Sequence, residues 1–329
     1  MPDTPAAAQP LVSVVVPTLN REHLLAKTLE SILAQDYANL EIIVIDAGSK
    51  PGTLALLRSY GDRITWQSRP DRGAFDAIND GWKQAKGDIL AWLNDDDTWV
   101  TPNAVSTAVQ YMTQHPDIDV AYGDCGGIDL DERLTWYGTA EPWDLRKAIV
   151  ECHPILNQPA TFMRREIIER VGYLYPAWCH DHELWLRIGL AGGTFGTIPA
   201  HLGNARLWGD NLHMDPSVVV PAKIALTQRI LQNPNLPDDL KRQRGRILSN
   251  AYLRCLDFLP RPRHWGWAAY VLLRSFLASP LNTPRIVEQV AVHVAWLVPG
   301  LRRRLQKRYG HGVQIERGSP LPATARGLS

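Results

Sequence analysis

Four polar residues, Asn94, Asp95, Asp96 and Asp97, directly follow the apolar run at 89–93. A run of this kind is typical of a buried strand, so the four side chains would lie at the carboxyl end of that strand. Clustered carboxylates suit a hard cation such as Mg²⁺ or Mn²⁺, which proteins usually share with the phosphates of a substrate. A solvated Asp-rich turn is the common alternative, so the surrounding segments must decide between the two.

The elements that would position these acids alternate between strand and helix along the first hundred residues. Runs that are apolar on both faces, separated by helical patterns, predict a parallel sheet between layers of helices. Ligands of such sheets bind beyond the carboxyl ends of the strands. We therefore expect the polar segments 17–21, 46–49 and 94–97 to line one crevice. The expected strands are 11–16, 41–46, 63–67 and 88–93, and the expected helices are 21–35, 52–60 and 74–86.

The residues after Val100 show a less regular, mixed α+β pattern, which would build the second wall of the crevice. From Pro216 the chain becomes helical and basic, with apolar stretches at 265–277 and 286–298 before the cationic run 302–308. The elements expected between these regions are helices at 102–115, 143–150 and 181–190, strands at 120–123 and 134–137, and a helix that begins at Arg165.

Charge and cysteine content narrow the classes of function. The 35 Lys and Arg residues nearly balance the 34 Asp and Glu residues, so composition gives no reason to expect a nucleic-acid partner. The four widely spaced cysteines form no CxxC pair, which favours reduced thiols in a cytoplasmic protein. Residues 1–10 lack the features of a signal peptide and are expected to be a disordered tail. No apolar stretch of about 18 to 20 residues predicts a membrane-spanning helix.

The motifs of the first two hundred residues occur in a fixed order, and as a set they resemble the inverting GT-A glycosyltransferases of family 2. The resemblance runs from Val12 to about Asn211. It implies an α/β GT-A fold, in which helices flank a Rossmann-like, mostly parallel sheet, followed here by a C-terminal helical extension. The matching segments are VPTLNR at 16–21, IDAGS at 45–49, DRGAFDAINDG at 71–81, GDILAWLNDDD at 87–97, NQPAT at 157–161 and DHELWLR at 181–187.

The resemblance gives the acid cluster a role toward a nucleotide-diphosphate sugar donor. The departing diphosphate needs a cation, and the family holds Mn²⁺ or Mg²⁺ with a DxD-type motif. Asp96 and Asp97 match the metal ligands, and Asp97 is the better direct ligand. Asp95 would support the two metal ligands or replace one of them, and it is also expected to contact the nucleotide sugar.

Further donor contacts follow from the same resemblance. Asp46 matches the acid that binds the base or ribose, although a turn aspartate bonded to nearby amides is the alternative. Asp76 and Asn79 share a helix face and could bond sugar hydroxyls, whereas capping of the helix by Asp76 is the alternative. The remaining expected donor contacts are Pro17, Thr18, Arg21, Arg72 and the cationic clamp Arg206, with His213 a possible substitute for a histidine that relatives carry where Trp208 stands here.

An inverting transfer also needs a base that takes the proton of the acceptor hydroxyl. The family places this base just before the LWLR helix, which points to Asp181, with Glu183 as second choice and acceptor contact. Capping of the helix by Asp181 is the structural alternative. Asn157 and Gln158 would face the acceptor sugar or serve as hydrogen bonders in a buried loop.

The sequence thus predicts a metal-dependent inverting glycosyltransferase that moves a sugar, with UDP favoured as carrier, to a saccharide or lipid-linked saccharide in surface polysaccharide or glycan synthesis. A nucleotidyltransferase, or a non-catalytic carbohydrate-binding protein that keeps the fold, are the alternatives. We expect a catalytic domain at 11–215, divided at residue 100 into nucleotide and acceptor halves, a helical extension at 216–311 and a disordered tail at 312–329. Residues 262–308 would touch the cytoplasmic face of a membrane, or pack on the protein or at a dimer interface.

Overall fold

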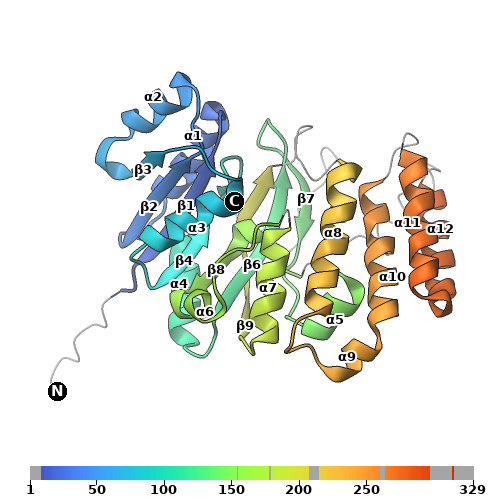
Figure 1. Ribbon diagram of the computed structural model, residues 1–329. Helices are drawn as coiled ribbons and strands as arrows, with labels where there is room; N and C mark the ends of the chain where they lie inside the picture. The colour runs from blue at the N-terminus through green and yellow to red at the C-terminus, as the bar shows by residue number, and fades with distance from the viewer. Residues whose placement is uncertain are drawn as a thin grey trace, which may run out of the picture.

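The centre of the protein is one mixed sheet, whose strands extend in Figure 1 from β3 on the left to β7 on the right. The computed structural model describes residues 9–153, 155–177, 179–206, 215–259, 264–296 and 313–314. Its strands are β1 (Val12–Thr18), β2 (Leu40–Asp46), β3 (Thr65–Ser68), β4 (Ile89–Trp92), β5 (Thr98–Trp99), β6 (Val120–Ile128), β7 (Leu134–Gly138), β8 (Thr161–Arg164), β9 (Phe195–Arg206) and β10 (Val313–Gln314).

The sheet has a parallel part and a mixed part. Strands β3, β2, β1 and β4 lie side by side and run parallel, as the alternating pattern of the first hundred residues predicts. Beyond β4 the sheet continues through β8, β6 and β7, which pair antiparallel. Strand β9 runs parallel to β6 and carries the short β5 on its end. This arrangement confirms the expected α/β GT-A fold class.

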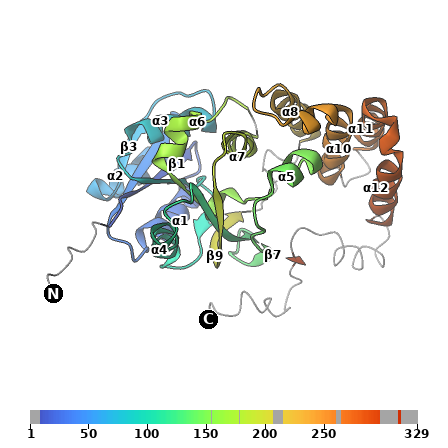
Figure 2. The same ribbon diagram turned by 90° about the horizontal axis from the view of Figure 1, so that it is seen from below.

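Alternate residues of the central strands face two different helical layers. Val14 and Val16 belong to the apolar cluster formed with α1 and α4, whereas Val15 packs in the opposite cluster with α3, α6 and α7. Figure 2 shows the two layers on opposite sides of the strands. Gly81 lets α3 approach closely, because a Cβ there would lie 2.4 Å from Cγ1 of Val15. The helices of this region are α1 (Glu22–Leu33), α2 (Pro51–Ser59), α3 (Ala74–Gln84), α4 (Ala104–Gln114), α5 (Leu145–Glu151), α6 (Arg165–Val171) and α7 (His180–Leu190).

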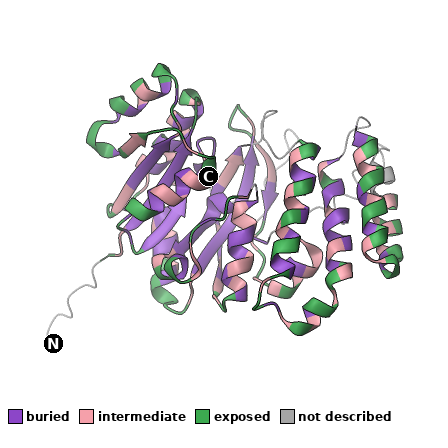
Figure 3. Cartoon of the chain, in the orientation of Figure 1, coloured by how far each residue is buried: buried purple, intermediate pink, exposed green. Residues whose placement is uncertain are grey.

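Five further helices extend the layer that holds α5 and α7. Two apolar clusters join α8 and α10 to α5 and α7, so the first part of the expected extension is packed onto the sheet domain. Helix α11 packs between α10 and α12 and leaves much of its surface exposed (Figure 3). No helix in the described part of the chain is long and apolar enough to cross a membrane. The five are α8 (Pro216–Leu231), α9 (Asp238–Arg242), α10 (Arg244–Arg254), α11 (Trp265–Ala278) and α12 (Thr283–Trp296).

Three segments differ from the sequence-based expectation. Residues 195–206 form the long strand β9, and residues 161–164 form β8, although no strand was predicted for either. Within the tail expected to be disordered at 312–329, Val313–Gln314 forms β10 and pairs with β7. At the other end, the carbonyl of Pro10 accepts a hydrogen bond from Tyr37 Oη (2.5 Å). Residues 1–8 and the rest of the C-terminal tail lie outside the described residues.

Candidate active site

The acids after β4 form a buried loop at the carboxyl edge of the parallel strands. Asp95, Asp96 and Asp97 are only 5%, 7% and 5% exposed. The turn closes on itself, because Asp97 N donates to the carbonyl of Asn94 (3.0 Å) and Asn94 Nδ2 donates to Asp97 Oδ2 (2.9 Å). The interpretation of these acids as a plain solvated turn is therefore wrong.

The loop after β1 binds the first two acids directly. Thr18 Oγ1 donates to Asp95 Oδ2 (2.8 Å), and Arg21 Nη1 lies 3.1 Å from both Asp95 Oδ1 and Asp96 Oδ2. Thr18 is also in register with Asp46 at the end of β2. The three polar segments at the strand ends thus meet at one edge, as predicted. In the described conformation, however, Thr18 and Arg21 bind the acid loop, and any contact they make with a nucleotide stays a prediction.

Arg206, at the end of β9, holds the acid loop through hydrogen bonds to Asp96 and Asp97. Its Nε donates to the carbonyl of Asp96 (3.0 Å), its backbone N donates to Asp97 Oδ1 (3.1 Å), and its Nη1 lies 2.8 Å from Glu132. The guanidinium is fully buried. As the expected cationic clamp, Arg206 would contact the diphosphate; in the described conformation its buried guanidinium holds the acid loop instead, and a contact with the diphosphate stays a prediction. Trp208 and His213 lie outside the described residues.

Because the carboxylates of the acid loop are buried and close together, the loop favours binding of a cation. Burial raises the pKa of Asp95 to about 6, with Arg21 opposing the shift. Burial and the neighbouring charge of Asp96 raise the pKa of Asp97 well above its usual range. Carboxylates that are costly to keep charged favour a cation that neutralises them.

In the described part of the chain no three His, Cys, Asp or Glu side chains converge as ligands of one ion. One or two carboxylates nevertheless suffice for Mg²⁺ or Mn²⁺ when a substrate diphosphate supplies other ligands. The residues present therefore fit such an ion.

Asp46, the expected base or ribose contact, forms a turn at the end of β2. Its Oδ2 accepts hydrogen bonds from Gly48 N (3.1 Å), Ser49 N (2.9 Å) and Ser68 Oγ (2.5 Å). These bonds match the alternative interpretation of Asp46, a turn aspartate bonded to nearby backbone amides. Its Oδ1 is buried and has no hydrogen-bond partner among the described residues. One carboxylate oxygen is thus structural, and the other is an acceptor without a protein donor.

The predicted contacts around α3 are occupied by protein groups. Arg72 and Asp76 form an ion pair at 2.6 Å, and Asp76 Oδ2 also accepts from the Arg72 backbone N (3.3 Å), which ties the residue before the N-cap to the first turn of α3. Asn79 exchanges two 2.8 Å hydrogen bonds with the backbone of Leu174. Asn79 therefore fastens α3 to the segment before α7. Only Arg72, whose side chain is mostly exposed, remains well placed to meet a ligand.

Helix α7 carries Asp181 in its first turn and packs on β4, the strand that leads into the acid loop. The helix ends at Leu190, and the chain then returns along the sheet as β9 (Figure 1). One turn after Asp181, Trp185 stacks on Trp92 with ring centroids 5.7 Å apart, and Trp92 in turn contacts Trp82 at 5.3 Å. This tryptophan column fixes α7 against β4.

The environment of Asp181 suits a proton acceptor. Its side chain is 31% exposed, and Oδ2 lies 3.9 Å from His182 Nε2. Burial acts to raise the pKa of Asp181, but the charges of His182 and His180 outweigh burial and lower it below its ordinary value. The N-cap residue of α7 is Cys179, which makes no side-chain cap, and Asp181 lies in the first turn, where a hydrogen bond with the His182 backbone also lowers its pKa.

Glu183 is buried in an ion-pair network and is 1% exposed. Its carboxylate binds Arg187 (Nη2 at 2.9 Å) and Arg229 from α8 (Nε at 3.1 Å). Arg187 also donates to the carbonyls of Val171, Gly172 and Tyr173. A base or acceptor contact must be reachable, so the structure speaks against both roles expected of Glu183. It anchors α7 to α8 instead.

Gln158 likewise supports the acid loop. Its Nε2 donates to the carbonyl of Trp92 (2.5 Å), and its Oε1 accepts from Asn94 (3.1 Å). The alternative of a structural hydrogen bonder thus describes Gln158 better than an acceptor contact does. Asn157 is half-buried, and its contact with an acceptor stays a prediction.

Sequence reasoning placed Asn94 in the polar cluster without its bracing role, and it missed the supporting residues Thr28 and Glu132. Thr28 Oγ1 donates to the carbonyl of Asp97 (2.8 Å) from the middle of α1. Asn94 could have been found from its place at the start of the DDD turn, since such amides often brace turns. Thr28 and Glu132 carry no local signal, because their roles depend on contacts across 69 and 74 residues.

Comparison with known proteins agrees with this geometry. Residues 13–172 match the profile of Glycosyl transferase family 2. An uncharacterized glycosyltransferase of Mycobacterium tuberculosis is 30% identical over 256 residues, which are 76% of this chain and 92% of the relative. The chain belongs to glycosyl transferase family 2. A second family member, an uncharacterized glycosyltransferase of Rickettsia typhi, is 29% identical over 187 residues, or 54% of this chain, and the match spans only 58% of that relative.

Two solved structures share the fold of this family 2 chain. The mannosyltransferase PcManGT from Pyrobaculum calidifontis, in complex with GDP-Man and Mn²⁺, gives a TM-score of 0.61 at 21% identity over 91% of this chain and 84% of that chain. S. aureus TarS 1-349, in complex with UDP-GlcNAc, gives 0.60 at 17% identity over 92% of this chain and 89% of that chain. At these identities the likeness establishes the GT-A fold.

Proposed function

We propose that the protein is a metal-dependent inverting glycosyltransferase, which moves a sugar from a nucleoside-diphosphate donor to a hydroxyl of a saccharide or lipid-linked saccharide. The observation that carries the proposal is the buried acid loop, braced by Arg21, Arg206 and Gln158 at the edge of the sheet where α7 presents Asp181. Family membership favours this reaction over nucleotidyl transfer and over carbohydrate binding without catalysis.

In this mechanism Asp97 and Asp96 would hold Mn²⁺ or Mg²⁺. When bound, the ion offsets the negative charge that develops on the departing diphosphate. Thr18, Arg21 and Arg206 keep the acid loop in one conformation, so little reorganisation is needed when the donor binds. Asp181, charged at neutral pH, takes the proton of the acceptor hydroxyl as that oxygen attacks the anomeric carbon.

The donor is a nucleoside-diphosphate sugar, and we favour UDP as its carrier. Two observations support a nucleotide at this edge. The buried Asp46 Oδ1, without a partner among the described residues, is an acceptor that an N–H or O–H of a base or ribose could satisfy. The two structural neighbours are complexes with GDP-Man and UDP-GlcNAc, which support a nucleoside-diphosphate sugar without choosing between the bases.

A thermal-shift panel of nucleotide sugars, each with and without Mn²⁺, tests the donor half. A donor that binds the folded state raises the melting temperature with its occupancy. We expect one donor to stabilise the protein, and to do so only when the metal is present. Stabilisation by a nucleoside triphosphate with release of pyrophosphate, and by no nucleotide sugar, would contradict the proposal.

Asp181→Asn tests the transfer half. The amide is isosteric but cannot accept the proton, so we expect donor-induced stabilisation to persist while transfer falls by a factor of about 10² to 10⁴. Glu166→Gln, an exposed change on α6, is the control for altered charge. Full transfer by Asp181→Asn would refute the assignment of the base.

The C-terminal helices are proposed to rest on the cytoplasmic face of a membrane. The exposed apolar side chains of α11 support this, with Trp265 at 64% and Leu277 at 63% exposure. The basic run 302–308 lies outside the described residues. Flotation with anionic liposomes should decrease when Trp265, Phe276 and Leu277 are replaced by serine, and unchanged flotation would exclude this surface as the contact.

A further inference from the structure

An open groove lies on the helical extension, between α8 and α11. Both helices pack on α10, which contributes Tyr252 to the lining of the groove (Figure 1). The volume of this α8–α11 groove is about 640 Å³, which is within the range of about 300 to 1,000 Å³ that ligand sites occupy. The groove can therefore hold part of a ligand. Its two walls include Val220, Ile224, Ala225 and Gln228 of α8 and Trp267 and Tyr270 of α11.

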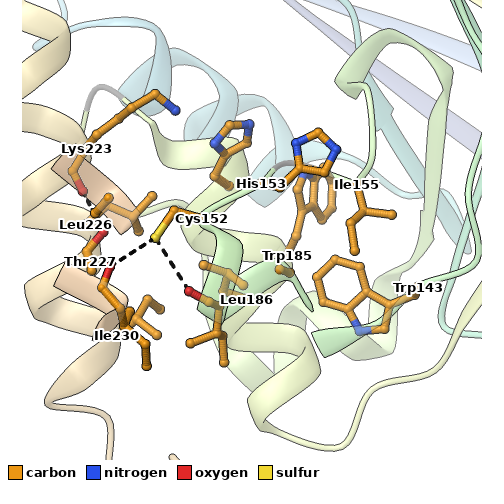
Figure 4. Close-up of a pocket in the computed structure, with 15 residues that line it drawn as sticks. Trp143, Cys152, His153, Ile155, Trp185, Leu186, Lys223, Leu226, Thr227 and Ile230 are labelled. Atoms are coloured by element: carbon orange, nitrogen blue, oxygen red, sulfur yellow. Dashed lines mark hydrogen bonds between the residues drawn. The ribbon is translucent and has the colours of Figure 1, made fainter. Parts of the chain in front are cut away.

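The other side of α8 belongs to the core. There Leu226 and Ile230 line a small space together with Trp143 and Trp185 (Figure 4). Its volume is about 40 Å³, which is enough for roughly three water molecules. Only the side of α8 that faces α11 thus leaves room for a ligand chain.

The walls of the α8–α11 groove are apolar and aromatic. Tyr270 meets the rings of Trp267 and Tyr252 edge to face, with centroids 5.8 and 6.4 Å away. None of the described residues that line the groove carries a charge, and Gln228 contributes its only amide side chain. A polyhydroxylated chain would lose hydrogen bonds to water here and regain few. A hydrocarbon chain loses none, so the walls favour hydrocarbon.

The helices that enclose the groove carry positive charge only. Arg229 and Arg254 have acidic partners. Arg274 lies beside the groove, with its guanidinium carbon 5.6 Å from the ring centre of Tyr252, and no carboxylate among the described residues forms an ion pair with it. Charge complementarity therefore favours an anionic ligand. The basic residues of α8, α10 and α11 are Lys223, Arg229, Arg244, Arg246, Arg254 and Arg274, and the three helices contain no Asp or Glu.

The groove is continuous with the exposed apolar side of α11. Leu273 and Leu277 follow Tyr270 at positions three and seven residues later, so they lie on the same side of the helix, and they are 57% and 63% exposed. This side is the surface that we propose rests on a membrane. A second copy of the chain fits less well, because a symmetric contact through the groove would bring the cations of the two copies together.

We propose that the α8–α11 groove binds one hydrocarbon chain of an anionic membrane lipid, and that Arg274 bonds the anionic headgroup of that lipid. The inference rests on the proposed membrane contact, because a bilayer is the source of the lipid. It goes further in assigning a site for a single lipid molecule and in requiring an anionic headgroup.

A chain-length series tests the groove without a membrane. Butyl, hexyl and octyl phosphate, kept below their micelle concentrations, are titrated calorimetrically into the full-length protein, with methyl phosphate as the short reference. Each added methylene that enters the groove should tighten binding about fourfold. An affinity that does not depend on chain length would overturn the proposal.

Two alanines locate the binding. Ala225 on α8 and Ala269 on α11 are both exposed, but only Ala225 lines the groove. Ala225→Phe should abolish the dependence on chain length, whereas Ala269→Phe should bind octyl phosphate like the wild type. Gly266→Phe fills the groove from α11, where a Cβ would meet no atom within 4 Å, and replaces Ala225→Phe if that variant is unstable. Equal affinity in all these variants would refute the groove.

Arg274→Gln tests the anionic headgroup. Octyl phosphate should lose about tenfold in affinity, because only a phosphate accepts charge-assisted hydrogen bonds from the guanidinium. Octyl β-D-glucoside has the same chain with a neutral head and should change little. Arg242→Gln removes an exposed cation of α9, which does not line the groove, and should alter neither affinity. Equal loss for both ligands in Arg274→Gln would refute the role of Arg274.

The related proposals fail in different experiments. Flotation of the wild type on anionic liposomes tests the membrane contact, whereas the titrations use soluble amphiphiles. Sedimentation velocity tests the other occupant: self-association that is lost in Ala225→Phe and kept in Ala269→Phe would make a second copy the occupant and overturn the lipid. Failure of the glycosyltransferase proposal would appear as the absence of stabilisation by any nucleotide sugar.

Discussion

Replacing Glu183 with glutamine separates a structural anchor from a catalytic base. Glu183 is 1% exposed and neutralises Arg187 and Arg229 at once, at 2.9 and 3.1 Å. Breaking a buried pair by neutralising one partner costs roughly 3 to 5 kcal/mol, and we expect about 3 kcal/mol because the amide oxygen can still accept one hydrogen bond. For 329 residues the entropy of unfolding is about 0.7 kcal/mol per kelvin, so the melting temperature should fall by about 4 °C.

The assay for this variant combines differential scanning fluorimetry with release of the nucleoside diphosphate. Well below its melting temperature, Glu183→Gln should keep most of the wild-type transfer rate, because the tryptophan column still holds α7 on β4. Glu169→Gln makes the same charge change on the exposed face of α6 and should leave both quantities unchanged. An unchanged melting temperature with transfer reduced about a hundredfold or more would refute the reasoning and make Glu183 the base.

Three further predictions concern the acid loop and the base. Asp97→Asn should remove the metal-dependent stabilisation by donor, which in the wild type reaches about 2.7 kcal/mol at a hundredfold excess over Kd; a persisting metal effect would assign the ion elsewhere. Arg206→Met should destabilise the fold by about 1 to 3 kcal/mol in chemical denaturation, because the buried Asp96 carbonyl loses its donor while the half-exposed Glu132 keeps Lys27 as a partner; a weaker donor affinity at unchanged stability would restore the cationic-clamp interpretation. Since the pKa of Asp181 is lowered, the base stays charged at neutral pH, and its own contribution to transfer should be lost only as the pH falls through that lowered pKa, below the ordinary aspartate range. A pH–rate limb nearer neutrality is expected from the raised pKa values of Asp95 and Asp97 and should persist in Asp181→Glu; displacement of that limb by Asp181→Glu would contradict this assignment.

The parallel strands of the fold were predictable from local sequence patterns, whereas the strand β9, which carries Arg206 to the acid loop, was not. Strands such as β1 and β2 are continuous apolar runs, and their polar ends mark the site at Thr18 and Asp46. Strand β9 contains Gly196, Pro199 and Gly203 and has no such run. It is a strand because β6 pairs with it over most of its length. Gly203 is needed there because a Cβ would lie 2.5 Å from the carbonyl of Pro159.

The same limit explains the site residues whose expected roles changed. Asp76, Asn79, Glu183 and Arg206 all have the chemistry that a ligand contact requires. The decisive partners of Asn79, Glu183 and Arg206 come from distant parts of the chain, as with Leu174 for Asn79 and Arg229 for Glu183, whereas Asp76 pairs with Arg72 four residues before it. Sequence position identifies which polar groups gather near the site, but only the packed structure reveals which of them are already satisfied by other protein groups.

The bracing of the acid loop also limits how this protein can be recombined with its relatives. Gln158 and Arg206 belong to the half expected to receive the acceptor, yet they hold the loop expected to serve the donor. A chimera that exchanges everything after residue 100 to change the acceptor would also exchange these two supports. Both must be carried over for the donor loop to keep its shape, so the two halves cannot be swapped as independent modules.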